Sequence, residues 1–367
     1  MNAVVKVDER EGRTGTQVRE VAVPEPAEGE VRLKVRATAI CGSDRHIYHW
    51  DPTVRDMIVT PRIYGHEFCG DIDAIGASPG RKDLREGDYA SAEMHVICGV
   101  CPQCVAGQGH VCQRTRIIGF HQDGSFAEYV IVPAQNVVPL DRAAVPLEVG
   151  AFLDALGNAV HTVQDHELEQ ATVAITGFGP IGAMAAAVTH HLRAARIYVI
   201  DLSPSAIAHA ERWRREAKAD NVTVLRTGPD EAAGVDERIL DETAGGVDLV
   251  LEMSGAQAAI NQALRIARMG GAVSLLGIPT REAVTIDRFA GNVIFKGLTL
   301  KAIIGRRIFS TWDRMLELLA DGLDLRALVS HEYEGLDAFI EGMEAFDTHE
   351  ALKVVFYPHG KNGGGHA

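Results

Sequence analysis

Four cysteines lie close enough together in the chain to surround a single metal ion. They are Cys98, Cys101, Cys104 and Cys112, four of only six cysteines in 367 residues. Thiolate sulfur is the ligand that Zn²⁺ prefers in closed, tetrahedral structural sites. Short spacings of this kind also hold iron–sulfur clusters, whereas disulfides would need an oxidising compartment, which nothing in the sequence indicates. We therefore predict a structural zinc site in a lobe over residues 95–115.

A second group of residues has the chemistry of a catalytic metal site. Cys41 follows a predicted strand and opens the run C-G-S-D-R-H, and a later run, G-H-E, contains His66 and Glu67. A cysteine, a histidine and a carboxylate make three protein ligands, the number that a catalytic zinc uses while one position stays open. Each residue alone has an ordinary structural explanation, but together with the four-cysteine cluster they predict a second zinc. Cys69 is expected to be a small buried residue and not a ligand.

A glycine-rich run predicts a nucleotide-binding turn. Gly177, Gly179 and Gly182 form G-x-G-x-x-G between the apolar strand ATVAIT and the start of a helix. The first glycine allows the tight turn, the second lets a pyrophosphate approach the backbone, and the third lets the helix contact the strand. N–H groups at the helix start would bind the phosphate. The pattern is weak by itself, and its place between strand and helix makes it informative.

Asp201 indicates which dinucleotide binds. It ends the next predicted strand, RIYVID, where an acid accepts hydrogen bonds from both ribose hydroxyls and repels a 2′-phosphate. No Arg or Lys occurs within the next ten residues to bind that phosphate. We therefore predict NAD rather than NADP. The alternative is a helix-capping Asp in an unrelated α/β domain.

The elements that position these residues are of two kinds. Up to about residue 140, short alternating strands such as GEVRLKVRATAI and FAEYVIVPAQNVV are separated by Gly and Pro. From about 157 to 300 the pattern changes to strand, helix, strand, which indicates a parallel sheet covered by helices. Helical spacing over 312–319 and 336–343 and a closing strand, ALKVVFY, return the chain to mixed structure. The last residues, GKNGGGHA, are predicted to form a flexible tail.

Composition argues against several classes of partner. The 36 basic and 50 acidic residues give a formal net charge of −14, which disfavours nucleic acid or an anionic membrane as the main partner. The chain does not open with a signal-like segment, and no apolar run reaches membrane-spanning length. We expect a soluble cytoplasmic protein with reduced thiols, whose length suggests two domains.

Taken together, these motifs resemble one family. C-G-S-D-x-H, G-H-E, the four-cysteine lobe and G-x-G-x-x-G occur in an order and spacing similar to those of the zinc-dependent medium-chain alcohol dehydrogenases. The resemblance covers nearly the whole chain. Its further supporting stretches lie at residues 38–51, 157–163, 179–188, 251–256, 276–279 and 294–312.

The resemblance implies an α/β fold with a GroES-like, mostly-β catalytic domain and a Rossmann cofactor domain that has a doubly wound parallel sheet. The expected order is a catalytic domain over 1–155, an NAD-binding domain over 156–300, a return to the catalytic domain over 301–360 and a tail over 361–367. The resemblance also implies two zinc ions per subunit, NAD as cofactor, and a homotetramer in which the structural zinc lobe lies near a subunit contact.

The activity that the resemblance implies is oxidation of a secondary alcohol by hydride transfer to NAD, with L-threonine converted to 2-amino-3-oxobutanoate. A polyol, a sugar or a vicinal diol is the alternative substrate. A non-catalytic NAD-binding scaffold with a structural metal is a third hypothesis, and the complete set of Cys41, His66 and Glu67 argues against it.

The resemblance also implies roles for single residues. Ser43 and His46 would relay the proton, Asp154 would ligate the catalytic zinc or assist the relay, and His95 would border the substrate. Arg306 and Arg307 could pair with a substrate carboxylate, but because paired arginines are more often exposed they are interpreted as a solvated edge or a subunit contact. The implied cofactor contacts are Ile181, Asp201, Leu276, Gly277, Ile278, Ile303 and Ile304.

The chain departs from the family pattern in three places. Ser43 replaces the usual Thr and keeps the hydroxyl, Asp154-Ala155-Leu156 replaces a Pro-Phe pair, and Ala206 replaces an Arg that commonly borders the adenosine. These changes leave dehydrogenase chemistry intact and the exact substrate open. With an amino-acid substrate, Glu67 or Asp154 would meet the ammonium group and His95 the carboxylate.

Overall fold

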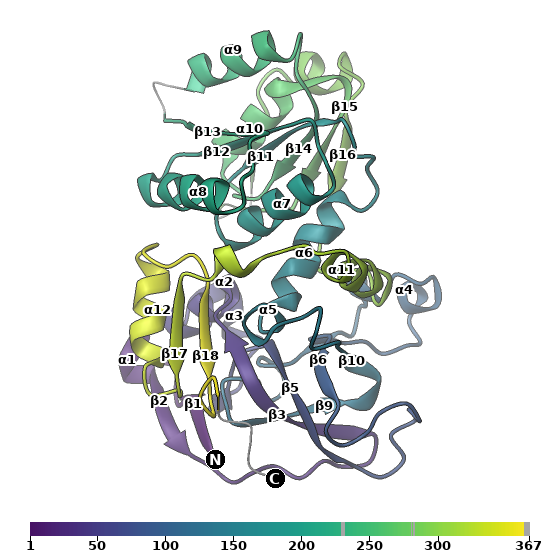
Figure 1. Ribbon diagram of the computed structural model, residues 1–367, viewed down its shortest axis with the longest axis vertical. Helices are drawn as coiled ribbons and strands as arrows, with labels where there is room; N and C mark the ends of the chain where they lie inside the picture. The colour runs from purple at the N-terminus through teal and green to yellow at the C-terminus, as the bar shows by residue number, and fades with distance from the viewer. Residues whose placement is uncertain (229–231, 280, 282, 363–367) are drawn as a thin grey trace. The chain divides into compact units, whose positions relative to one another are not determined.

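The computed structural model describes residues 1–228, 232–279, 281 and 283–362. The chain divides into two compact units (Figure 1). The first unit is Met1–Ala155 together with the chain from Val329 onwards, and the second is Leu156–Leu328. Of the expected tail at 361–367, residues 363–367 lie outside the described part of the chain.

The chain returns to the first unit later than the expected residue 301. Residues 301–328 belong to the second unit, because α11 (Ser310–Ala320) and the segment before it are bonded to residues that follow α6 (Leu153–Val163). The Oγ1 of Thr311 donates to Oε1 of Gln164 at 2.9 Å, and Arg307 forms an ion pair with Asp165. The expected boundary is therefore corrected to Val329.

The first unit is built around β3 (Glu30–Ala39). Along this strand buried and half-buried positions alternate, because Val31, Leu33 and Val35 point to one face. The strand order in its main sheet is β10-β6-β5-β3-β18-β17, and β9 also pairs with β3. The elements before residue 156 are β1 (Asn2–Lys6), α1 (Gly12–Gly15), β2 (Thr16–Glu20), β3, α2 (Gly42–His49), α3 (Pro52–Arg55), β4 (Arg62–Ile63), β5 (Glu67–Ile75), β6 (Tyr89–Ala92), β7 (His95–Val96), α4 (Pro102–Val105), β8 (Arg116–Ile117), β9 (Tyr129–Pro133), β10 (Val137–Pro139), α5 (Leu147–Gly150) and the start of α6.

The C-terminal segment completes this sheet. It consists of β17 (His331–Glu334), α12 (Phe339–Asp347) and β18 (Val354–Tyr357). β18 pairs antiparallel with β3, where Val355 lies opposite Ala39, and β17 pairs parallel with β18. The last part of the chain therefore lies beside the strand that leads to Cys41.

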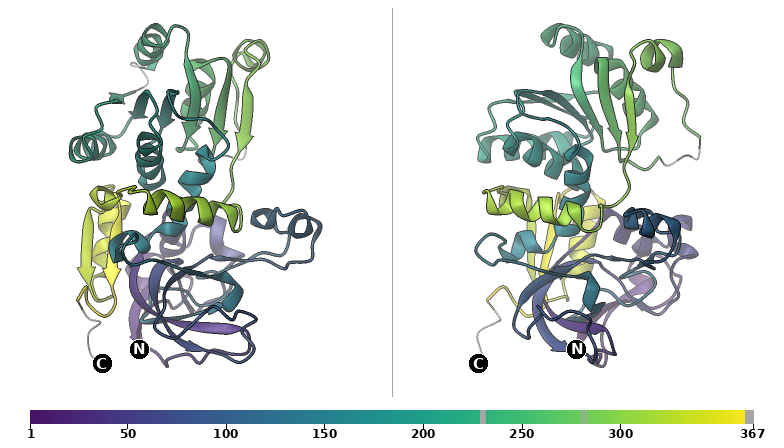
Figure 2. Two further views of the ribbon diagram at one scale, coloured as in Figure 1. Left: turned by 45° about the vertical axis from the view of Figure 1, so that its right-hand side comes forward. Right: turned by 90° about the vertical axis from the view of Figure 1, so that its right-hand side faces the viewer.

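The second unit is a six-stranded parallel sheet in the order β13-β12-β11-β14-β15-β16. Because parallel strands are joined by right-handed crossovers, α7 and α8 cover one face of the sheet and α9 and α10 the other (Figures 1 and 2). Successive strands are added on one side of β11 up to β13 and on its other side from β14 onwards. Parallel sheets of this kind bind ligands at such a switch in strand order. The elements are β11 (Thr172–Thr176), α7 (Pro180–His191), β12 (Arg196–Asp201), α8 (Pro204–Glu216), β13 (Val222–Arg226), α9 (Ala232–Glu242), β14 (Val247–Glu252), α10 (Gln257–Ile266), β15 (Ala267–Leu275), β16 (Thr299–Ala302) and α11.

These two units confirm the predicted fold class, a mostly-β domain and a doubly wound parallel sheet. Among the described residues, none of the helices is long and apolar enough to cross a membrane.

Candidate metal centre and cofactor loop

The pairing of β3 with β5 brings the three residues of the first candidate metal site together. Ala39 lies opposite Glu67 in this antiparallel pair, so Cys41, just beyond β3, meets the start of β5. The ligand atoms of Cys41, His66 and Glu67 all lie within 4.8 Å of one another. Residues that are 25 positions or so apart in sequence thus form one cluster, with the number of protein ligands that a catalytic zinc uses.

The start of α2 positions the side chains around this cluster. Cys41 is the N-cap of α2, and its backbone N–H donates to the buried carboxylate of Asp44 at 2.9 Å. Since the Cys41 side chain in turn faces the backbone N–H of Asp44, the two residues form a capping box that fixes the first turn of the helix. Ser43, on the same turn, has its Oγ 3.3 Å from Nε2 of His66. The predicted relay hydroxyl therefore lies beside a predicted metal ligand.

Burial leaves a carboxylate oxygen of the cluster without a hydrogen-bond partner. His66 and Glu67 are 2% and 0% exposed. Oε1 of Glu67 forms no hydrogen bond within the described part of the chain, whereas Nδ1 of His66 lies 3.6 Å from Oδ1 of Asp44 and Nε2 lies near the Ser43 hydroxyl. Buried polar atoms normally have a partner, and a bound metal ion would supply one for Glu67, so these residues fit a metal site.

The electrostatic environment also favours a cation. Burial would lower the pKa of His66, but the nearby carboxylate of Asp44 helps to raise it to about 10. Burial raises the pKa of Glu67 to about 7, with Lys353 opposing and Asp154 adding to the rise. The shift of His66 reports the nearby negative charge of Asp44, and the shift of Glu67 reports mainly its burial; a divalent cation bound here would stabilise the deprotonated form of both side chains.

Lys353 is a residue of this site that sequence reasoning missed entirely. It is 1% exposed, forms an ion pair with Oε2 of Glu67, and donates to the carbonyl of Ile40 at 2.8 Å. Its Nζ also lies 5.7 Å from the centre of the Phe152 ring. The only signal in the sequence was a charged residue inside the apolar run ALKVVFY. Lys353 holds one oxygen of Glu67 and leaves the other facing the cluster.

Asp154 and His95 both lie outside the group of three candidate ligands. Asp154, on the first turn of α6, is 5% exposed and acts electrostatically on His66 and Glu67, but it is not part of the group within 4.8 Å. His95 lies on β7, where its Nδ1 is 2.6 Å from Oε1 of the buried Glu93. His95 thus has a fixed orientation beside the four-cysteine lobe.

The four cysteines of the lobe form the second candidate metal site. Their ligand atoms also lie within 4.8 Å of one another. The Sγ atoms are 3.5 Å apart for Cys101 and Cys104, 3.6 Å for Cys98 and Cys112, and 3.9 Å for Cys101 and Cys112. A tetrahedral ion with bonds of about 2.3 Å would separate its sulfur ligands by about 3.8 Å. The spacing therefore fits zinc.

The pKa values of the cysteines in the lobe also agree with a metal site. Backbone N–H groups, first that of Val100, lower the pKa of Cys98 to about 6. Burial and the neighbouring sulfurs raise the pKa of Cys104 to about 12. Four sulfurs this close cannot all be thiolates unless a cation lies between them. Cys69, by contrast, is fully buried, accepts a hydrogen bond from the Tyr89 hydroxyl at 3.2 Å, and belongs to neither group.

The glycine-rich loop lies between β11 and α7 and has the shape that a dinucleotide needs. Gly177 has φ +98°, and a Cβ on Gly182 would lie 2.0 Å from the carbonyl oxygen of Gly177. A Cβ on Gly179 would meet nothing within 4 Å, so the backbone there is open to a ligand. Asp201 accepts hydrogen bonds from the N–H of Phe178 at 2.7 Å and of Ser203 at 2.8 Å. Its carboxylate therefore borders the loop.

Glu252 organises a second turn at the same edge of the sheet, a role that sequence reasoning did not foresee. This buried carboxylate accepts hydrogen bonds from the N–H of Ser254 at 2.9 Å and of Gly255 at 3.0 Å. Its carbonyl accepts from the N–H of Leu276 and of Gly277. The predicted contact residues in this region differ in exposure, with Ile278 at 81%, Ile304 at 55% and Ile303 at 7%. Ile181 lies on the first turn of α7.

The interpretation of Arg306 as part of a solvated edge or a subunit contact is corrected. Arg306 is fully buried, its Nη1 lies 3.5 Å from Oδ1 of Asn158, and its guanidinium lies over the Trp312 ring. A Cβ on Gly157 would lie 2.1 Å from Cδ of Arg306, so the glycine makes room for this side chain. Arg307 is half-buried and paired with Asp165.

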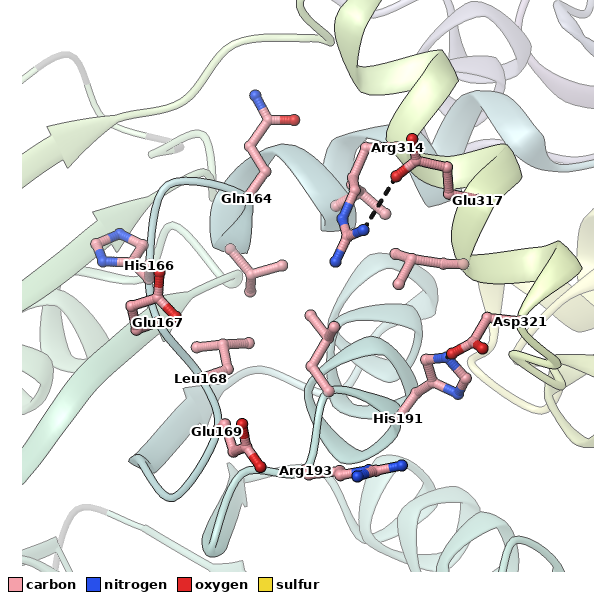
Figure 3. A pocket seen from close by; sticks show the side chains of 14 residues that line it. Gln164, His166, Glu167, Leu168, Glu169, His191, Arg193, Arg314, Glu317 and Asp321 are labelled. Carbon is pink, nitrogen blue, oxygen red and sulfur yellow. Dashed lines mark hydrogen bonds and ion pairs between the residues drawn. The ribbon is translucent and has the colours of Figure 1, made fainter.

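A separate cavity of about 580 Å³ in the second unit contains none of the predicted site residues. It lies between the ends of α6, α7 and α11, and its charged lining includes His191 paired with Asp321 and Arg314 paired with Glu317 (Figure 3).

Comparisons with known proteins identify the family of the chain. An alcohol dehydrogenase GroES-like domain matches residues 27–142, and a zinc-binding dehydrogenase domain matches residues 180–321. The chain is 40% identical to an L-threonine 3-dehydrogenase of Bacillus velezensis over 98% of this chain and 99% of that protein. Among solved structures it is similar to alcohol dehydrogenase TADH from Thermus sp. ATN1, with TM-score 0.82 and 31% identity over 97% of this chain and 99% of that chain. It is also similar to galactitol-1-phosphate dehydrogenase from Escherichia coli, with TM-score 0.83 and 26% identity over 98% of this chain and 100% of that chain.

The buried ion pair predicts a large and selective loss of stability. Lys353→Met keeps about the same side-chain length but removes the ion-pair partner of the buried Oε2 of Glu67, which should reduce the free energy of unfolding by about 3–5 kcal/mol. Urea denaturation of the zinc-loaded protein measures it. The matched control is Lys361→Met, which breaks the exposed pair with Glu332 and should cost about 1 kcal/mol or less. Equal losses in the two variants would contradict this account of Lys353.

Proposed function

This chain belongs to the zinc-binding alcohol dehydrogenase family, and we propose that it oxidises L-threonine to 2-amino-3-oxobutanoate with NAD. The observation that carries the proposal is the group of Cys41, His66 and Glu67, whose ligand atoms lie within 4.8 Å of one another and include a buried carboxylate oxygen of Glu67 with no hydrogen-bond partner among the described residues. The identity to an L-threonine 3-dehydrogenase over nearly the full length supports the choice of substrate.

The proposal includes two zinc ions per chain, one at each group of candidate ligands. Zinc at Cys41, His66 and Glu67 would supply Lewis acidity, which makes an alcohol hydroxyl easier to deprotonate, and NAD would supply the hydride acceptor. In the balanced reaction the C–H bond of the carbinol gives a hydride to NAD, the O–H bond gives a proton to solvent, and a ketone remains. The four-cysteine lobe would hold its zinc as a closed structural site.

The proton is proposed to leave by way of α2. Ser43 and His46 are three residues apart on this helix and therefore share one face. The Ser43 hydroxyl, 3.3 Å from His66, is next to the predicted metal ligands, while the side chain of His46 is 47% exposed. Ser43 would accept the proton of the alcohol as it passes its own onward, and His46 would release it to water.

The acids of the site support an amino-acid substrate. Asp154 and Glu67 are proposed to face its ammonium group, since both carry buried negative charge around His66. Asp154 would act in this way or as a further zinc ligand. His95, held by Glu93, is proposed to contact the carboxylate.

Asp201 is proposed to select NAD. Its carboxylate borders the glycine-rich loop through the N–H of Phe178 and would accept hydrogen bonds from the ribose hydroxyls. We further propose that the protein acts in the cytoplasm as a homotetramer. The six cysteines form no disulfide, which supports a location in the cytoplasm. The exposed Val100 and Val105 on the lobe support a subunit contact there.

A polyol dehydrogenase activity is the second candidate. The similarity to galactitol-1-phosphate dehydrogenase favours it, as does Asp154-Ala155-Leu156, which changes the shape of the chain next to the metal cluster.

A substrate panel distinguishes the two candidates. With NAD, NADH formation should be fastest with L-threonine at millimolar concentration and slow with sorbitol, butane-2,3-diol and glucose. Turnover of a polyol or diol without turnover of L-threonine would reject the proposed substrate. Cys41→Ser should lower the rate at least about a hundredfold while NAD binding persists, because the metal site is lost and the cofactor loop is not.

Removing the charge of Asp201 should relax cofactor selectivity. Asp201→Asn keeps an acceptor for the Phe178 N–H but no longer repels a 2′-phosphate, so the ratio of kcat/KM for NAD over NADP should fall at least about tenfold. Steady-state kinetics with both cofactors measures the ratio. As a control, Asp220→Asn changes an exposed acid outside the loop and should leave the ratio unchanged. An unchanged ratio in Asp201→Asn would remove this residue from cofactor selection.

Zinc content tests the assignment of the two sites. Cys104→Ser should lower the zinc content from about two ions per chain to about one, because a closed site needs all four of its sulfur ligands. Elemental analysis of the purified protein measures it. Cys69→Ser makes the same chemical change at a cysteine outside both groups and should retain both ions. Full zinc content in Cys104→Ser would show that the lobe is not a zinc site.

A further inference from the structure

A carboxylate close in sequence holds the imidazole of His46. Nδ1 of His46 and Oδ2 of Asp51 form a short hydrogen bond. The other carboxylate oxygen of Asp51 accepts from the backbone N–H of Thr53 at 2.9 Å and from the Thr53 hydroxyl. Both oxygens are therefore engaged, and the direction in which Asp51 faces His46 is fixed.

The backbone that brings these residues together is unusual. Trp50 ends α2 in the left-handed region, with φ 52° and ψ 44°, which is sterically unfavourable for a bulky residue. The conformation persists because the ring is 5% exposed and because Nε of Arg55 donates to the Trp50 carbonyl at 2.8 Å. Nζ of Lys6 donates to the Tyr48 carbonyl at 3.0 Å and lies 5.5 Å from the centre of the Trp50 ring. This costly turn folds Asp51 back onto His46, and such strain points to a functional constraint.

The other charged groups on and against α2 have different partners. Arg45 and His49 both pair with Asp347, at the end of α12, and the carboxylate of Asp44 accepts from the N–H of Cys41. In the described chain, Asp51 is thus the acid that is hydrogen-bonded to His46. Burial opposes the ionisation of Asp51, but the hydrogen bonds from Thr53 and His46 outweigh it and lower the pKa of the carboxyl group.

We propose that Asp51 is a positioning residue of the proton relay, which keeps the proton of neutral His46 on Nδ1 and leaves Nε2 as the acceptor. The inference rests on the proposed function, since it gives the relay its last protein group. As the O–H bond of the alcohol breaks, the proton passed on by Ser43 forms an N–H bond at Nε2. Asp51 stabilises the resulting imidazolium, as the acid of a catalytic triad does, and Nε2 then gives the proton to water.

The tautomer of His46 tests the pair without any substrate. In the full-length zinc-loaded protein labelled at its histidines, the ring signals of His46 are identified by their loss in His46→Gln. The wild type should show the Nδ1-protonated tautomer. Asp51→Asn should show the opposite tautomer, since an amide can donate to Nδ1. An unchanged tautomer would overturn the proposal.

Steady-state kinetics tests the role in catalysis. In Asp51→Asn, kcat/KM for the alcohol should fall at least about tenfold, with KM for NAD changed less than about twofold, because the proton acceptor is no longer held in the required tautomer. Asp51→Ser keeps an oxygen to cap the Thr53 N–H without the charge, and it should show the same loss. Wild-type kinetics in Asp51→Ser would mean that Asp51 serves only as a helix cap.

A double-mutant comparison links the effect to His46. In a His46→Gln background, adding Asp51→Asn should change kcat less than about twofold, because the residue it positions is absent. A further tenfold loss would show that Asp51 acts independently and would overturn the proposal. Thr53→Val removes only the hydroxyl contact and should remain close to the wild type. If no alcohol is oxidised at all, the proposed function fails, while the tautomer of His46 still decides whether Asp51 positions the ring.

Discussion

The constraint on which the first unit depends is a concentration of buried negative charge at the ends of β3 and β5. The carboxylates of Asp44, Glu67 and Asp154 are all nearly or fully buried, and such charges are stable only when they are paired or bound to a metal. Lys353 supplies one positive charge through its ion pair with Glu67. The remaining negative charge, together with the unsatisfied oxygen of Glu67, makes the cluster complementary to a divalent cation.

This constraint explains why the chain returns to the first unit after the second. Lys353 immediately precedes β18, and the antiparallel pairing of β18 with β3 carries its ammonium group to the carbonyl of Ile40 and to Glu67. The ion pair between Lys353 and Glu67, which are 286 positions apart, thus connects the C-terminal segment to the site. The second unit is inserted between the two halves and carries the glycine-rich loop at the switch point of its sheet.

Local patterns made much of the site predictable from sequence, and long-range pairing made the rest unpredictable. The four cysteines and the glycine-rich loop lie within short stretches, so spacing alone indicated their chemistry. Lys353 and Glu252 act through contacts that only sheet pairing and turn formation create, and ALKVVFY showed merely a strand. Arg306 was misread because paired arginines are usually exposed, whereas Gly157 provides a space for this one. The boundary at 301 was placed too early because contacts with residues after α6, and not periodicity, assign α11 to the second unit.

The most direct test of the whole account is anomalous diffraction at the zinc absorption edge from crystals of the zinc-loaded protein. The account predicts one peak within about 2.0–2.3 Å of the ligand atoms of Cys41, His66 and Glu67, and a second at the centre of the four cysteines. A single peak in the cysteine lobe, with Cys41, His66 and Glu67 showing no metal, would contradict it.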